Sequence, residues 1–246
     1  MIKIVSEDNK KYKLLKKLLT SKGRKETNLF LAEGEKFLIF NPSEIFVHEF
    51  YNFDEEKYKN VTILSEKLFD QISTQENSQG VICLFEMKKE EAITSNFILV
   101  LDKIRDPGNL GTIIRSAEFF GIKDIILINC VDIYNPKVVR ATMGAIFNIN
   151  FLNCRKEKIL DLKSENFKIV ATSSRDYDFS LEELDIKDKI ALVLGNEAAG
   201  VDEFILENCD SKVSIPSFGS SESLNVSMAA SIFIYSISIK RKDLNI

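Results

Sequence analysis

Three short segments combine polar residues with glycine or proline directly after apolar runs, in positions where α/β proteins commonly bind ligands. They read DPGNLGTIIRS at residues 106–116, LGNEAAG at 194–200 and IPSFGSSESLNVS at 215–227. Each follows a short apolar, strand-like run, and the third leads into a long apolar stretch. Open α/β sheets bind ligands at the carboxyl ends of their strands, and a helix entrance offers free backbone N–H groups. These segments are therefore the candidate site.

Residues in the first two segments also allow structural interpretations. Asn109 lies in a turn-forming run, and Arg115 follows six residues later on an otherwise apolar helix. Such a cation needs a partner, which could be a ligand or a structural ion pair. Gly195 permits close backbone approach to a ligand. The stretch from Gly195 to Glu197 would equally suit a plain turn between a strand and a helix.

The third segment opens the last helix of the chain. Ser223, Asn225 and Ser227 lie at its entrance, where Ser and Asn are usually caps. Beyond them, residues 228–239 are apolar nearly all round, interrupted only by serines. Such a helix must be buried on more than one side, either in a core or against a second subunit.

Several common site chemistries are not favoured by the sequence. The single histidine, His48, lies in an alternating stretch that predicts a strand position rather than a Ser-His-Asp or Cys-His site. The four cysteines are widely spaced without a CxxC pair, which argues against zinc and against a disulfide framework. The chain also lacks GxGxxG and GxxxxGK loops, which argues against a Rossmann-type nucleotide enzyme.

Length and composition indicate a soluble globular protein. The chain has 246 residues, of which 45% are hydrophobic, so one large domain or two ordinary ones are expected. No apolar run reaches the roughly 20 residues of a membrane span, and charges occupy the place of a signal-peptide core. These features predict a cytoplasmic protein without a membrane partner. Net charge is −4, yet residues 1–25 carry nine Lys or Arg and only two acidic residues. Such a basic segment is either a solvated helix face or a binding site for a polyanion.

The order of the predicted elements indicates two α/β domains. A helix is predicted over residues 12–22, and a short strand or turn near 30–31 leads into a second helix. Strands are predicted at 44–48, 61–64 and 80–85, with a helix at 65–72 between the last two. Four continuous apolar runs follow, at 97–102, 124–129, 167–173 and 189–195. Continuous apolar strands separated by helices predict a parallel sheet covered on both faces. The expected division is 1–90, a linker at 91–96, and 97–246.

Taken together, DPGNLGTIIRSAEFFG, LVLGNEAAGV and IPSFGSSESLNVSMAA resemble the three sequence motifs of the SpoU (TrmH-like) family of RNA ribose 2′-O-methyltransferases, in the SPOUT superfamily. Their order and spacing match the family across residues 97–246. More loosely, GRKETNLFLAEGEKFL, SEKLFDQIS and QGVICLF look like the family's L30e-like RNA-binding domain across residues 1–90.

The resemblance implies an α/β fold whose C-terminal parallel-sheet domain contains a deep trefoil knot, preceded by a small L30e-like α/β domain. It implies S-adenosylmethionine as cofactor, no metal, and a homodimer formed through the C-terminal domain. The residues that match the family's catalytic positions are Arg115, Asn109, Glu197, Ser223 and Asn225. The implied cofactor contacts are Gly195, Ile215 and Leu224, with Thr172 and Ser173 as further candidates.

The implied reaction is methyl transfer to a ribose 2′-hydroxyl of RNA, in which Arg115 would assist deprotonation or stabilise the developing alkoxide. RNA gives the basic N-terminus a partner, and its predicted contacts include Lys16, Lys17, Lys22, Arg24 and Lys25. The two-domain plan favours ribosomal over transfer RNA. A transfer-RNA enzyme is one alternative, and a catalytically inactive knotted RNA-binding assembly factor is another. The intact Arg115 and Asn225 argue against the inactive protein.

Overall fold

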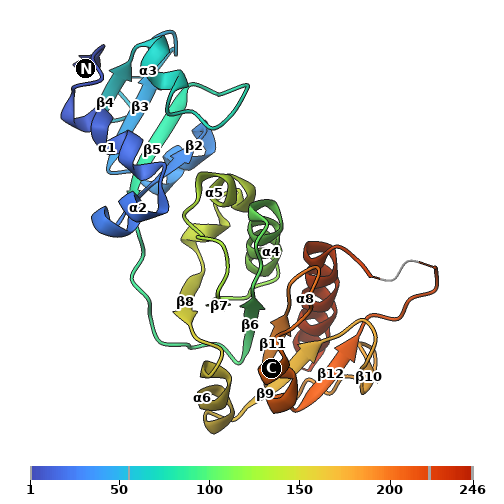
Figure 1. Cartoon of the computed structure of the whole chain (residues 1–246). Helices are drawn as coiled ribbons and strands as arrows, with labels where there is room; N and C mark the ends of the chain where they lie inside the picture. The colour runs from blue at the N-terminus through green and yellow to red at the C-terminus, as the bar shows by residue number, and fades with distance from the viewer. Residues whose placement is uncertain (1, 55, 221–222, 245–246) are drawn as a thin grey trace. The chain divides into compact units, whose positions relative to one another are not determined.

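The computed structural model describes residues 2–54, 56–220 and 223–244 (Figure 1). Contacts within it form two compact units, one made of residues 1–89 with 132–147 and the other of 90–131 with 148–246. The sequence predicted a division near residue 90. It did not predict that residues 132–147 belong to the first unit. No helix in the described ranges has the length and apolar character needed to cross a membrane.

The first unit contains a mixed five-stranded sheet. Its order is β1-β4-β3-β5-β2, with β1, β4 and β3 parallel and with β5 antiparallel to both of its neighbours. The strands are β1 (Ile2–Ile4), β2 (Leu29–Glu33), β3 (Glu44–His48), β4 (Val61–Leu64) and β5 (Val81–Glu86). The helices are α1 (Lys10–Leu18), α2 (Ser21–Thr27), η1 (Glu35–Phe40), α3 (Glu66–Asp70), α5 (Pro136–Thr142) and η2 (Ala145–Phe147).

Helices α1 and α3 pack into the apolar core of this unit. Leu15 and Leu18 of α1 join Leu68 and Phe69 of α3 in one buried cluster with side chains from the sheet. The lysines of α1 point away from this cluster, as the spacing of its leucines predicts. Burial of the leucine stripe therefore determines which face of α1 remains basic and accessible.

The helix predicted over residues 12–22 is in fact two helices. Thr20 has an extended backbone, and its hydroxyl accepts the N–H of Gly23 at 3.0 Å, so it caps a new helix. A Cβ at Gly23 would lie 2.0 Å from the carbonyl oxygen of Lys17. This close approach explains why a glycine lies inside the first turn of α2. The leucine pattern alone could not reveal the break.

Segment 132–147 completes the first unit with an aromatic cluster and a buried ion pair. Its Phe147 ring stacks on Phe40, with centroids 4.3 Å apart, and lies 4.7 Å from the ring of Phe85. Asp132 accepts hydrogen bonds from Nε and Nη2 of Arg24 at 3.0 and 2.6 Å. Residues far apart in sequence thus share one core.

The second unit is built on a seven-stranded sheet in which every pair is parallel. Its order is β10-β12-β9-β11-β6-β7-β8. The strands are β6 (Phe97–Asp102), β7 (Asp124–Ile128), β8 (Asn150–Cys154), β9 (Phe167–Thr172), β10 (Phe179–Ser180), β11 (Lys189–Leu194) and β12 (Ser211–Ser214). The four predicted apolar runs are the strands β6, β7, β9 and β11, so the predicted parallel sheet is confirmed.

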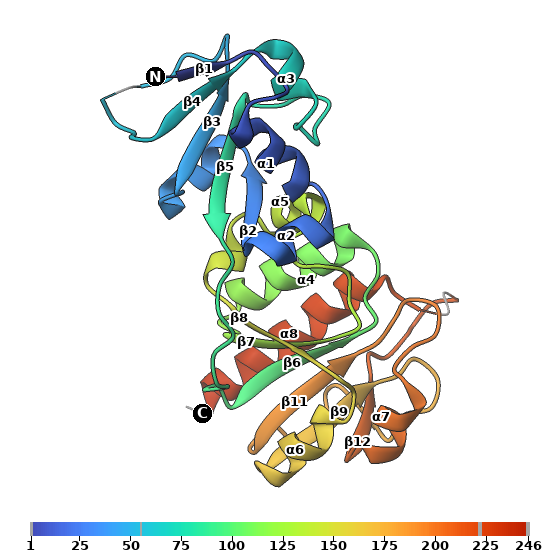
Figure 2. The same cartoon turned by 60° about the vertical axis from the view of Figure 1, so that its left-hand side comes forward.

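Helices cover both faces of this sheet, as continuous apolar strands require. Helices α4 (Pro107–Phe119) and α8 (Val226–Asp243) lie on one face, and α6 (Lys158–Ser164) and α7 (Glu203–Asn208) lie on the other (Figure 2). Ile159 and Leu162 of α6 and Ile205 of α7 join one buried cluster with alternate residues of β6, β9 and β11. Helices α4 and α8 contact each other directly through Ser116 and Ser231, whose hydroxyls are 2.8 Å apart.

Candidate active site

The candidate residues follow the carboxyl ends of four neighbouring strands. Ile215 comes just after β12, Thr172 ends β9, Gly195 follows β11, and the loop to Asn109 follows β6. Strands in a sheet are about 4.8 Å apart, so these ends share one sheet edge of about 15 Å. The N–H of Ser173 donates to the carbonyl of Val213 at 3.0 Å, which fixes the backbone beside β12. Topology thus gathers the predicted cofactor and catalytic segments at one edge.

A chain of side-chain hydrogen bonds joins all three sequence segments. Nδ2 of Asn225 donates to Oδ1 of Asn109 at 3.1 Å. Nδ2 of Asn109 donates in turn to Oε1 of Glu197 at 2.7 Å. Both ends of the Asn109 amide are therefore used, one by each of the other segments. The structure brings together three of the five predicted catalytic residues.

Two of the polar residues at the helix entrances are also helix caps. Oδ1 of Asn225 accepts the N–H of Ser227 at 2.9 Å and its hydroxyl at 2.6 Å, so Asn225 caps α8. Asp106 caps α4 by accepting the N–H of Asn109 at 2.7 Å. The capping interpretation is confirmed for Asn225, and it is compatible with a role in the site, because the cap uses Oδ1 and leaves Nδ2 for Asn109.

The geometry of its own loop requires a glycine at position 195. A Cβ at this position would lie 2.2 Å from backbone atoms of Gly200 and Val201. Asn196 and Gly200 exchange backbone hydrogen bonds of 2.9 Å, which closes the loop beneath Glu197. The side chain of Asn196 accepts the N–H of Ala198 at 2.9 Å and donates to the carbonyl of Lys103 at 3.0 Å. Asn196 was not predicted as a site residue, although it lies between two that were.

A charged cluster attaches the far end of this loop to β6. Asp102 is fully buried, and its Oδ2 accepts the N–H of Asp202 at 2.8 Å. Its Oδ1 is buried without a partner among the described residues, and burial raises the pKa of Asp102. Asp202 accepts Nζ of Lys103 at 2.5 Å and of Lys156 at 2.9 Å, and these bonds lower the pKa of Asp202 to about 2. Asp102 was not predicted, although an acid at the end of the apolar run 97–102 is a signal that could have identified it.

Arg115 and Ser223 stand apart from this hydrogen-bonded chain. Arg115 is exposed on α4, and it forms no ion pair with the part of the chain that the structure describes. The structural ion pair considered from its sequence context is therefore not found there. Ser223 and Leu224 are exposed as well, directly after the two residues that lie outside the described ranges. An exposed guanidinium can bind an anionic ligand.

The predicted RNA-contacting residues of the first unit divide into two groups. Lys16, Lys17, Lys22 and Lys25 are exposed on α1 and α2, where Lys17 also pairs with Glu26 at 2.8 Å. Arg24 is only 2% exposed, and its guanidinium binds Asp132 and the carbonyl of Leu18. The prediction of an RNA contact at Arg24 is therefore withdrawn, because its donors are used inside the unit.

Comparisons with known families match both parts of the chain. A profile of the SpoU rRNA Methylase family matches residues 96–235, and a profile of the MRM3-like substrate binding domain matches residues 9–83. The 23S rRNA (guanosine(2553)-2′-O)-methyltransferase RlmP of Bacillus subtilis is 34% identical over 96% of this chain and 98% of its own length. The 23S rRNA (guanosine-2′-O-)-methyltransferase RlmB of Coxiella burnetii is 35% identical over 68% and 67%.

Solved structures agree with this similarity over nearly the whole chain. A crystal structure of an RNA 2′-O ribose methyltransferase has 29% identity and a TM-score of 0.82, covering 98% of this chain and 100% of its own. The AdoMet-bound rRNA methyltransferase from Sinorhizobium meliloti has 29% identity and a TM-score of 0.84, with 98% of both chains covered.

The charged cluster predicts an acid-dependent loss of stability. Asp202→Asn keeps an α7 cap but removes the carboxylate that Lys103 and Lys156 hold. The lowered pKa of Asp202 means that its contribution is fully present above the unfolded value of about 4 and is lost as pH falls towards 2. Denaturant unfolding between pH 4 and 2 should therefore show a shallower loss of unfolding free energy in the variant. The exposed Asp188→Asn should retain the wild-type slope, and equal slopes in all three proteins would contradict this role.

Proposed function

Because the chain belongs to the SpoU rRNA methylase family, we propose that it transfers the methyl group of S-adenosylmethionine to a ribose 2′-hydroxyl of ribosomal RNA. The observation that carries the proposal is the hydrogen-bonded chain from Asn225 through Asn109 to Glu197. It joins the three sequence motifs at the carboxyl edge of a parallel sheet, where such folds bind ligands.

Relatives that act on ribosomal RNA support this choice of substrate. The names of the relatives from Bacillus subtilis and Coxiella burnetii both specify 23S rRNA and a guanosine 2′-oxygen. The Bacillus relative aligns with almost the whole of this chain, first unit included. We therefore favour ribosomal RNA over transfer RNA. All five predicted catalytic positions carry the residue types of the family, which supports an active enzyme over an inactive binding protein.

The residues at the sheet edge fit S-adenosylmethionine. Ile215 and Leu224 supply apolar surface, Leu224 being 48% exposed, while the hydroxyls of Thr172 and Ser173 and the backbone after Gly195 supply polar partners. Apolar contacts with a few placed hydrogen-bonding groups are what a nucleoside-sized ligand requires. When bound, S-adenosylmethionine would supply a reactive methyl group attached to a sulfonium.

The protein's own contribution would be alignment and charge stabilisation. Orientation of two reactants can lower a barrier by roughly 7–11 kcal/mol. We assign to Arg115 the contact with the ribose 2′-oxygen and the neighbouring phosphate, where its charge stabilises the alkoxide that forms as the hydroxyl proton passes to solvent water. A guanidinium normally keeps its proton, which favours this electrostatic role over that of a base. Asn109, Glu197 and Asn225 would hold the ribose or the guanidinium, and Ser223 would join them when RNA binds.

The finer features of the family fold are part of the same proposal. We propose that the second unit contains the deep trefoil knot, in which residues after β12 pass through the loop at 195–202. The return of the chain from β12 to α8, which packs on α4, supports this path. We also propose that residues 1–90 act as an L30e-like RNA-binding domain, with a linker at 91–96 and a methyltransferase domain at 97–246. A cytoplasmic location belongs to this proposal.

The exposed face of α8 supports a homodimer. Met228, Ile232, Tyr235 and Ile239 recur every three or four residues and remain exposed, which makes one apolar stripe along the helix. The ring of Tyr235 packs against Phe120, the residue directly after α4, with centroids 5.5 Å apart. A contiguous exposed apolar stripe marks an interface. We propose that a second copy of the chain covers it, so that this helix is buried on both sides as its sequence predicts.

Arg115→Ala tests the catalytic assignment. Loss of the cation should reduce methyl transfer from tritiated S-adenosylmethionine to ribosomal RNA by about 10²–10³-fold, the usual effect of removing a group that stabilises an oxyanion. Binding of S-adenosylmethionine, measured by calorimetry, should stay near the wild-type affinity. The exposed Arg155→Ala, also in the second unit, is the matched control. Transfer within about tenfold of wild type would sink the assignment.

Ile232→Glu tests the dimer. A charge in the centre of the apolar stripe should give the mass of one chain, about 28 kDa, in light scattering, where wild type should give twice that mass. Leu160→Glu places the same charge at a comparably exposed leucine on α6 and should leave the dimer intact. A single-chain mass for the wild type at micromolar concentration would refute the proposal.

Replacing Lys16, Lys17, Lys22 and Lys25 by alanine tests the RNA surface of the first unit. Each phosphate contact that is lost should reduce the slope of log affinity against log salt by roughly 0.7–0.9. The variant should therefore bind ribosomal RNA fragments more weakly and with less salt dependence. A control with alanine at Lys57, Lys59, Lys88 and Lys89 changes the net charge equally. Equal losses in both variants would show that charge alone, rather than this surface, determines affinity.

A further inference from the structure

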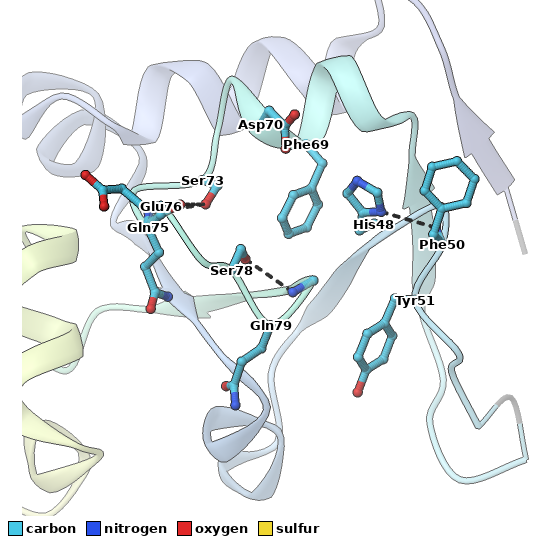
Figure 3. Close-up of a pocket in the computed structure, with 11 residues that line it drawn as sticks. His48, Phe50, Tyr51, Phe69, Asp70, Ser73, Gln75, Glu76, Ser78 and Gln79 are labelled. Carbon is cyan, nitrogen blue, oxygen red and sulfur yellow. Dashed lines mark hydrogen bonds between the residues drawn. The ribbon is translucent and has the colours of Figure 1, made fainter.

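The first unit contains a hollow of about 540 Å³ that the proposed methyl transfer does not use. It lies where β3 ends, between α3 and the loop that leads to β5 (Figure 3). Its walls come from the turn at residues 48–51, from the end of α3 and from residues 73–80. The predicted RNA contacts and the candidate active site include none of these residues.

Aromatic rings form much of the wall. The His48 ring lies edge-on to Phe69, with centroids 5.3 Å apart, and 5.4 Å from the ring of Phe50. Phe50 is 75% exposed, although it is a large apolar side chain. Tyr51 is held by a hydrogen bond from its hydroxyl to Glu35 at 2.6 Å. Figure 3 shows Phe69, His48 and Tyr51 across an open space from Ser78 and Gln79, with Phe50 at the outer edge beside His48.

Hydrogen bonds to a buried carboxylate hold the opposite wall in place. Glu33 accepts the hydroxyls of Ser73 at 2.5 Å and Ser78 at 2.6 Å, and the N–H and hydroxyl of Thr74 at 2.9 and 3.1 Å. Gly80 has a φ of 77°, and a Cβ there would lie 3.1 Å from the Tyr51 ring. The loop is thus fixed on both sides, and a ligand would meet a largely preformed surface.

The charges around the hollow favour a cationic ligand. Asp70 and Glu76 are exposed carboxylates of the lining, and neither lysine nor arginine occurs among the described residues that line it. Nδ1 of His48 accepts the N–H of Phe50 at 3.2 Å, which holds the imidazole ring beside Phe50. Aromatic faces and carboxylates together attract cations, and the two acids repel phosphate.

We propose that this hollow binds an arginine side chain from a basic segment of a protein partner. A guanidinium is planar, stacks on aromatic rings and donates two parallel hydrogen bonds to a carboxylate, which an ammonium does not. The aromatic wall would supply the rings and Asp70 the acceptor. Glu76 lies on the other side of the hollow with its carboxylate turned away from the rings (Figure 3), so it would contribute only its charge. An unpaired RNA base could also stack and donate here, but its phosphates would approach both carboxylates. Charge complementarity favours the arginine.

Short peptides added to the isotopically labelled full chain test the binding. Acetyl-Gly-Arg-Gly-amide should shift backbone NMR signals at residues 48–51 and 69–80. The lysine analogue should bind more weakly, and the glutamine analogue should leave these signals unmoved. Guanosine 5′-monophosphate is the competing probe for the RNA interpretation. Because none of these measurements uses methyl transfer, the result is independent of the proposed enzymatic function.

Variants connect the binding to named side chains. Phe50→Ala should weaken the arginine peptide about two- to fivefold, since exposed cation–π contacts have this size. Asp70→Asn with Glu76→Gln should weaken it by at least as much and remove its salt dependence. Ile39→Ala, a comparably exposed apolar residue, and Glu86→Gln, at the other end of β5, are the matched controls and should bind as wild type. Thermal melting of each variant checks that it remains folded.

Three results would overturn the proposal. The first is the absence of binding by the arginine peptide to the wild type at millimolar concentration. The second is equal binding of the arginine and glutamine peptides, which would mean that charge plays no part. The third is tighter binding of guanosine 5′-monophosphate than of the arginine peptide at the same signals, which would assign the hollow to RNA.

Discussion

The geometry of the candidate site depends on the side-chain amide of Asn109. An amide offers donors at one end and an acceptor at the other, and here Glu197 accepts from one end while Asn225 donates to the other. A carboxylate at this position could not donate, and a lysine could not accept. The amide therefore fixes the distance between two helix entrances and a loop that are otherwise remote in sequence. Its own position is fixed by the cap at Asp106.

Backbone geometry and charge together hold the loop that presents Glu197 in place. Gly195 allows two backbone segments to approach more closely than any side chain would permit, and Asn196 fills the donors and acceptors inside the turn. Two aspartates then attach the loop to the end of β6. Asp102 is buried and accepts the N–H of Asp202, whose carboxylate forms ion pairs with Lys103 and Lys156. The proposed cofactor contacts and the proposed catalytic side chains thus share one support, which is the carboxyl edge of the central strands.

Sequence patterns predicted those parts of the fold that depend on residues close together in the chain. Four strands were recognisable because burial on both faces requires unbroken apolar runs, and the three motif segments were recognisable because Gly, Pro, Asn and Ser cluster there. Strand β8 reads NFLNC and β10 has two residues, so neither has a pattern of its own. The burial of Arg24 depends on Asp132, more than a hundred residues away, and no local charge count contains that information. Asn196 and Asp202, which support the site, were missed because their partners Lys103 and Asp102 lie 93 and 100 residues away in the sequence.

Segment 132–147 has a consequence for how such proteins recombine during evolution. In the chain it lies between two strands of the second unit, yet its aromatic residues and Asp132 complete the core of the first. A gene fusion that exchanged residues 1–89 alone would separate Phe147 from Phe40 and leave Arg24 buried without its carboxylate. Unpaired buried charges and exposed aromatic clusters are both strongly unfavourable. The first unit is therefore discontinuous in sequence, and exchanging it intact would require the sixteen residues 132–147 as well as residues 1–89.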